Sequence, residues 1–195
     1  IADPKTNQLA LNRKSLTAAE MMVFARYVMI REVYWHKTVR SATAMLQACV
    51  QQMPTPENIE AICSLSDHEA DIYIRDTTNA SQLAADLFGP IRKLHKSVFQ
   101  CNASNNPEIF HRVAGLSYAE LIATSQRLQA LMHCGNTPNA VLIDAPPTEL
   151  EVQFDLNVYL AMTDCFTPLS DRSPVVRGLA EEQFDYHVKR VRIFV

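Results

Sequence analysis

The feature that most constrains the fold is a long helical stretch. Residues 15–52 contain neither proline nor glycine, and Pro54 and Pro56 follow directly. The segment Ser15-Leu16-Thr17-Ala18-Ala19-Glu20 is typical of a helix start, in which Thr17 caps the helix and Glu20 completes a capping box. A helix from there to about Gln52 is long for a globular protein, so we expect a kink near residues 35–37.

Cations interrupt the apolar surface of this helix. At ~100° per residue, one stripe combines three cations with four apolar residues: Arg26, Lys37 and Arg40 with Met22, Met29, Val33 and Ala44. We expect this stripe to face the core, where cations usually need an anion.

Two interpretations of these cations remain open. In the first, Arg26, Lys37 and Arg40 neutralise a polyphosphate, and Tyr34 and Trp35 offer a flat face to a base. In the second, the arginines pair with carboxylates of neighbouring helices and the two aromatic residues belong to the core. A second basic cluster, Arg92-Lys93-Leu94-His95-Lys96, has a solvated basic surface as its default interpretation.

The remaining pattern predicts an α+β protein. Short helices are expected over 57–65, 66–74 and 80–87, then at 107–114, 118–133 and 174–184. Strands are expected at 140–144, 154–161 and 186–195, around a turn at Pro146-Pro147, whereas 91–99 fits strand or helix. We therefore expect a mainly helical segment over 1–89, containing the long apolar helix, followed by a small mixed α+β part over 90–195 with a few strands.

Composition limits the classes of partner. The net charge is −3 and the pI is near 6.1, so no general basic field attracts nucleic acid, which we consider an unlikely partner. The five cysteines include no CxxC pair, which is typical of reduced thiols and favours a cytoplasmic location. No signal peptide is present and no apolar run approaches the ~18 residues of a membrane span, so no membrane partner is expected.

Common catalytic motifs are absent from the sequence. It contains no HExxH, P-loop or GxSxG motif. The one acidic cluster around a histidine, Asp67-His68-Glu69 with Asp71, is explained by a solvated helix start without a metal. We therefore predict neither a catalytic residue nor a metal ligand in this chain.

A family resemblance covers most of residues 16–195 in order. Residues 21–42, M-x-x-x-A-R-Y-x-M-x-R-x-V-Y-W-H-K-T-V-R-x-A, resemble a helix of the HD-domain phosphohydrolases, in the branch of the deoxynucleoside triphosphate triphosphohydrolases. Residues 92–96 are similar to that family's R-x-L-[FY]-K strand, with His95 in the aromatic position. Later elements of the family are similar to four further segments of the chain: Ser66-Asp67, residues 141–146, residues 166–173 and residues 191–195.

The chain departs from this family at the metal site. The family holds a divalent metal with a histidine, a His-Asp pair and a later aspartate, but no His-Asp dipeptide occurs here. The resemblance implies that these ligands precede Ile1, so that the chain is the C-terminal part of a metal-dependent hydrolase. By itself the segment is expected to be inactive and to need no cofactor.

The resemblance also assigns site residues. It implies that Arg26 approaches the substrate phosphates and that Tyr34 lines the same pocket. It implies that four further residues contact an activating nucleotide at a subunit interface: His36, Lys37, Arg92 and Lys96. The expected partners are a nucleoside triphosphate, in the intact protein, and further copies of the chain.

Two alternatives remain for the function. One is a non-catalytic helical interaction or regulatory module that binds an acidic partner through the basic helix. The other is an HD-type enzyme that acts on a different phosphoester.

Overall fold

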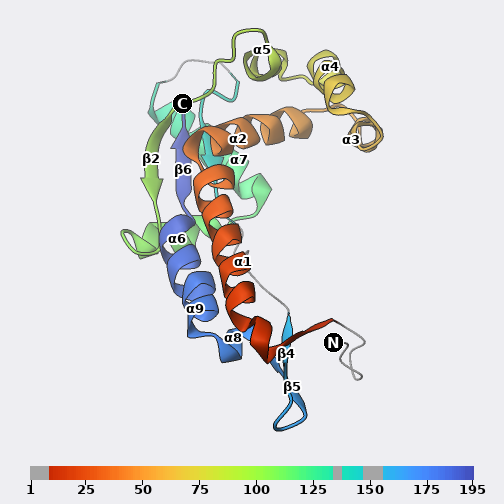
Figure 1. Cartoon of the computed structure of the whole chain (residues 1–195). Coiled ribbons are helices and arrows are strands. Elements are labelled where there is room, and N and C mark those ends of the chain that lie inside the picture. The colour runs from red at the N-terminus through yellow and green to blue at the C-terminus, as the bar shows by residue number, and fades with distance from the viewer. Residues whose placement is uncertain (1–8, 134–137, 147–155) are drawn as a thin grey trace. The chain divides into compact units, whose positions relative to one another are not determined.

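The computed structural model describes residues 9–133, 138–146 and 156–195, which form two compact units (Figure 1). Unit 1 takes its described residues from the segments Ile1–Trp35, Asn102–His111 and Pro146–Arg190. Unit 2 comprises the described residues of His36–Cys101, Arg112–Ala145 and Val191–Val195. Each unit therefore combines residues from both sides of position 89, and the boundary expected there stays a prediction.

Unit 1 consists of helices and a small sheet. Its helical elements are η1 (Arg13–Ser15), α1 (Leu16–Met29), the π-helical η2 (Ile30–Tyr34), α8 (Leu169–Arg172), α9 (Pro174–Arg177) and the π-helical η3 (Gly178–Val188). Helix α6 (Pro107–Ala114) begins in this unit. In the sheet, β4 (Asn157–Leu160) lies between β1 (Ala10–Asn12), which is parallel to it, and β5 (Cys165–Pro168), which is antiparallel.

Helix α1 packs against the C-terminal helices of unit 1, and Figure 1 shows it beside α8 and α9. One apolar cluster joins Val23 of α1 to Leu169 and Val176. A second cluster contains Tyr27, Ile30, Trp35, Phe184 and Val188, and the rings of Trp35 and Phe184 meet edge to face with 6.1 Å between centroids. Trp35, the residue that follows η2, is therefore held in the core of unit 1.

Unit 2 combines five helices with an antiparallel sheet. The helices are α2 (Lys37–Gln51), α3 (Pro56–Ile62), α4 (Asp67–Thr77), α5 (Ser81–Phe88) and α7 (Tyr118–Leu131). In the sheet, β6 (Val191–Phe194) lies between β2 (Ser97–Cys101) and β3 (Leu142–Asp144). Its core joins α2, α5 and the sheet through residues such as Met45, Cys49, Leu83, Leu87, Leu142 and Phe194.

The expected α+β class is confirmed by these helices and two three-stranded sheets. The expected kink is also confirmed, because η2, which continues α1, ends at Tyr34 and α2 begins at Lys37. His36 between them has an extended backbone, with φ −62° and ψ 136°. The single long helix is therefore two helices.

Some predicted boundaries are wrong. The capping box of Thr17 and Glu20 does not form, because α1 begins at Leu16 and Glu20 instead accepts a hydrogen bond from Ser173 Oγ at 2.6 Å. The strand expected over 186–195 is reduced to β6, because η3 continues through Val188. Residues 92–96 are not strand, although Lys96 and Val195 exchange backbone hydrogen bonds at 2.8 and 3.0 Å. Pro147 and Phe154 lie outside the described residues.

In the described part of the chain, no helix combines the length and the apolar character that crossing a membrane requires. Four cysteines lie in that part, all as free thiols; Cys49 and Cys101 are buried, whereas Cys63 is exposed. Burial raises the pKa of the Cys49 thiol to about 11, so this side chain is a neutral core residue.

Candidate functional site

Arg26 lies on the exposed side of α1. The residues of α1 and η2 that enter the core are Ala19, Val23, Tyr27 and Ile30, spaced three or four apart as on one helix face. The part of the predicted stripe in α1 and η2 is exposed instead: Met22 is 64% exposed, and Met29, Val33 and Arg26 are exposed with it. In α2, Ala44 of the same stripe is buried and Arg40 is half-buried, as expected. The prediction is wrong for α1 because this helix is apolar on both sides, and periodicity could not select the side that unit 1 covers.

The exposed side of α1 is an unusual surface for a helix. Five of its large apolar residues are exposed in α1 and the following turn: Met21, Met22, Phe24, Met29 and Val33. Exposed apolar groups of this density usually mark a surface that another protein part covers. Arg26 therefore brings a guanidinium group to an otherwise apolar surface.

Tyr34 ends the π-helical turn η2 and is 58% exposed, whereas its neighbour Trp35 is buried. The interpretation of both as core aromatics is thus correct for Trp35 and wrong for Tyr34. Single π-helical turns inside helices are frequent at functional sites, because they shift the direction of the side chains that follow. Here the turn places a phenol ring in solvent within unit 1, the unit that also contains Arg26.

The four predicted nucleotide-contacting residues lie in unit 2 on two segments that touch. His36 caps α2, with Nδ1 accepting a hydrogen bond from the Thr38 backbone N–H at 3.3 Å, and Lys37 is the first residue of that helix. One turn later, Ser41 Oγ donates to the backbone oxygen of His95 at 2.6 Å. The segment containing Arg92 and Lys96 therefore lies along the first turns of α2.

This arrangement is a basic surface. Lys37, Arg92 and Lys96 are all exposed, and none of them forms an ion pair with the described residues. Exposed cations on two adjoining segments attract anions such as phosphates or acidic side chains. The structure brings these three residues and His36 into one unit, whereas Arg26 and Tyr34 belong to the other.

Arg40 pairs with a carboxylate, as the second interpretation expects, but this carboxylate belongs to a strand and not to a neighbouring helix. Its guanidinium forms a two-pronged pair with Asp144 of β3, in which Nε donates to Oδ2 at 2.9 Å and Nη2 contacts Oδ1. Arg192 of β6 lies opposite Asp144 in the sheet register, and its Nη1 is 3.6 Å from Asp144 Oδ2. The buried carboxylate thus joins the first turn of α2 to two strands, and holds the helix start that carries Lys37.

The part of the chain that the structure describes offers no metal site. Within 9–133, 138–146 and 156–195, no three or more His, Cys, Asp or Glu side chains are grouped to hold a metal ion. In the acidic cluster of α4, Glu69 accepts hydrogen bonds from the backbone N–H and the hydroxyl of Ser66, at 2.9 and 2.6 Å. These bonds lower the pKa of Glu69, which acts as a helix cap.

Comparison with known proteins identifies a family and solved structures of similar fold. Residues 3–192 match the family described as "HD associated region". The chain is similar in fold to a crystal structure of a hypothetical protein from Aquifex aeolicus, with a TM-score of 0.54 and 18% sequence identity. That match covers 97% of this chain and 44% of the Aquifex chain, so the chain spans less than half of that relative. None of the curated proteins compared with the chain matches it.

Proposed function

Because the chain belongs to the HD-associated region family, we propose that it is the C-terminal part of a metal-dependent HD-type phosphohydrolase that acts on deoxynucleoside triphosphates. The family match over residues 3–192 is the observation that carries the proposal. The likeness of residues 21–42 to a helix of the deoxynucleoside triphosphate triphosphohydrolases supports the substrate class.

In this proposal Arg26 binds the phosphate chain of the substrate. A guanidinium group presents two parallel N–H donors to phosphate oxygens and keeps its charge at any physiological pH. Its position on the exposed apolar side of α1 supports this role, because a covering protein part would exclude water and strengthen the interaction. Tyr34 would line the same pocket with its exposed ring.

The metal-binding residues of the proposed enzyme lie outside this chain. Among the described residues, no group of side chains is suited to hold a metal ion. In such enzymes a divalent metal activates water and stabilises charge on the reacting phosphate. The contribution of this chain is to bind the phosphates, orient the substrate and cover the reaction.

The basic surface of unit 2 has a regulatory role in this proposal. His36, Lys37, Arg92 and Lys96 would contact an activating nucleotide at an interface between copies of the protein. Two observations support this: three of the four are exposed cations, and the segments that carry them adjoin through the Ser41–His95 hydrogen bond. If the chain were a non-catalytic interaction module, the same cations would contact an acidic partner. For both functions we propose a cytoplasmic location.

The proposal predicts that catalysis needs more than this chain. The 195-residue chain, incubated with deoxynucleoside triphosphates and Mg²⁺ or Mn²⁺, is expected to show no hydrolysis above a protein-free control, whereas the longer protein that carries it hydrolyses them. Chromatography of the nucleotides measures both. Metal-dependent turnover by the 195-residue chain would contradict the assignment of its site, and inactivity of both would favour the interaction module.

A further inference from the structure

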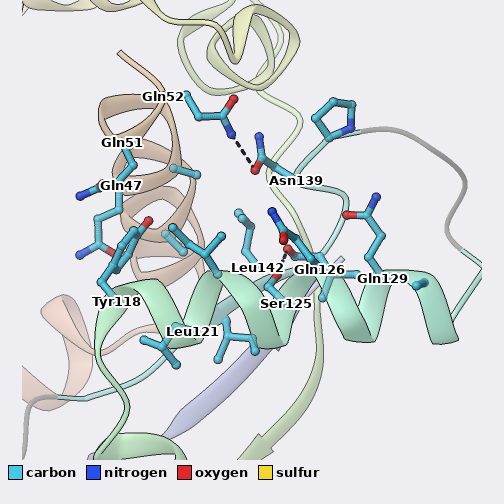
Figure 2. A pocket seen from close by; sticks show the side chains of 17 residues that line it. Gln47, Gln51, Gln52, Tyr118, Leu121, Ser125, Gln126, Gln129, Asn139 and Leu142 are labelled. Carbon is cyan, nitrogen blue, oxygen red and sulfur yellow. Dashed lines mark hydrogen bonds between the residues drawn. The ribbon is translucent and has the colours of Figure 1, made fainter. Parts of the chain in front are cut away.

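Unit 2 contains a cavity that the proposed function does not use. Its volume is about 560 Å³, within the range of roughly 300–1,000 Å³ that is usual for small-molecule sites. Figure 2 shows it between α2, α7 and the segment that leads into β3. The lining consists of Ala44, Gln47, Ala48, Gln51, Gln52, Tyr118, Leu121, Ile122, Ser125, Gln126, Gln129, Ala130, Pro138, Asn139, Val141, Leu142 and Ile143.

Hydrogen bonds fix the walls of this cavity. Gln52, the residue that follows α2, donates from Nε2 to Asn139 Oδ1 at 2.8 Å, and Ser125 Oγ of α7 donates to the backbone oxygen of Val141, as the dashed lines in Figure 2 show. The backbone oxygen of Asn139 lies 3.0 Å from His95 Nε2. Both helices are thereby tied to the segment before β3, so the cavity is preformed.

Among residues 9–133, 138–146 and 156–195, no charged side chain lines the cavity. A phosphate or carboxylate placed in it would lose water without gaining a cation, which is unfavourable. The basic residues discussed above are not among the lining residues. The cavity is therefore suited to an uncharged molecule.

The polar groups of the lining both donate and accept hydrogen bonds. In the described part of the chain, the carboxamides of Gln47, Gln51 and Gln126 take part in no hydrogen bond, so they are available to a ligand. Each carboxamide offers two N–H donors and an acceptor oxygen. Burial raises the pKa of Tyr118, so its hydroxyl stays protonated and can donate a hydrogen bond at neutral pH.

We propose that this cavity binds an uncharged heterocycle of the nucleoside class, held by Gln51, Gln126 and Tyr118 over apolar residues. The edge of a nucleobase presents adjacent donors and acceptors that match a carboxamide, and its flat faces fit the apolar surface of Ala48, Leu121 and Leu142. A free sugar lacks such a face. The proposal does not depend on the hydrolase activity.

Binding of matched probes tests this proposal. Isothermal titration calorimetry is performed on the protein with adenosine, guanosine, cytidine and thymidine, and with the 5′-monophosphate of each. At least one nucleoside is expected to bind with a dissociation constant below 1 mM, and its monophosphate at least about tenfold more weakly. Absence of nucleoside binding, or equal binding of nucleoside and monophosphate, would overturn the proposal.

Two variants locate the binding in the cavity. Gln51→Leu and Gln126→Leu each remove one carboxamide from an exposed position, and each is expected to weaken binding about five- to tenfold. Gln82→Leu is the matched control, because Gln82 is an exposed residue of α5 outside the cavity, and its variant should bind as the parent does. Equal affinity of all three variants would place the ligand elsewhere and overturn the proposal, whether or not the protein hydrolyses nucleotides.

Discussion

Replacing Asp144 with alanine is expected to lower the free energy of unfolding by about 3–5 kcal/mol. The carboxylate is buried, pairs with Arg40 through two contacts and lies 3.6 Å from Nη1 of the equally buried Arg192. Its removal leaves two guanidinium groups in a weakly solvated place without their common anion, which costs more than the lost hydrogen bonds alone. Urea unfolding followed by circular dichroism measures the change.

Asp171→Ala is the control for this prediction. Asp171 also pairs with an arginine, Arg177 at 3.5 Å, but both side chains are more than half exposed. Because water screens such a pair, its loss should change stability by less than about 1 kcal/mol. Similar midpoints for the two variants would show that the Asp144 cluster does not hold α2 to the sheet.

Replacing Arg26 with alanine is expected to lower kcat/KM for deoxynucleoside triphosphates about 100-fold in the longer protein proposed above. In the proposed function this guanidinium offsets charge on the phosphate chain, so its loss acts on the transition state. Stability should change by less than about 0.5 kcal/mol, because the side chain is exposed on α1. Steady-state kinetics and thermal unfolding of the same preparation separate the two effects.

Two further variants sharpen this prediction. Arg26→Lys keeps the charge but loses the paired donors, so its activity should lie between those of the parent and the alanine variant. Arg177→Ala removes an exposed arginine of α9 in the same unit and should leave turnover unchanged. Unchanged turnover in Arg26→Ala would remove this residue from the phosphate site.

Local signals in the sequence predicted the helices well. Helix α6 has the predicted bounds, 107–114, because Pro107 favours a helix start. Ser173 caps α9 as expected, accepting from the Val176 backbone N–H at 3.2 Å, and Pro174 is the first helical residue. The break at His36 follows the predicted position of the kink. These features depend on neighbours within four residues, so sequence alone contains the relevant information.

Contacts between distant residues were not predictable in this way. Arg40 and Asp144 are 104 positions apart, and neither spacing nor composition pairs them. The sequence predicts a local capping box for Glu20, but its carboxylate accepts a hydrogen bond from Ser173, 153 positions away. In α7 the polar Ser125 is buried and donates to the backbone oxygen of Val141, whereas the apolar Leu131 is 75% exposed. Tertiary contacts override local preference at each of these positions.

In the candidate site, too, local sequence patterns identified residues, whereas features that depend on distant contacts were missed. Residue patterns singled out the basic residues at 26–40 and 92–96, and the structure brings His36 and Lys37 to the same unit as Arg92 and Lys96. The side of α1 that carries Arg26 was misassigned, because both sides are apolar. The amide-lined cavity gave no signal at all, since its walls come from 44–52, 118–130 and 138–143, and isolated glutamines on helices have no motif.

The identity of the phosphate product tests the central claim most directly. The longer protein is incubated with dGTP and a divalent metal, and the products are followed by ³¹P NMR. We expect inorganic triphosphate and deoxyguanosine in equal amounts, without accumulation of dGDP or orthophosphate. Release of orthophosphate with dGDP, or no turnover of any of the four deoxynucleoside triphosphates with Mg²⁺ or Mn²⁺, would contradict the account.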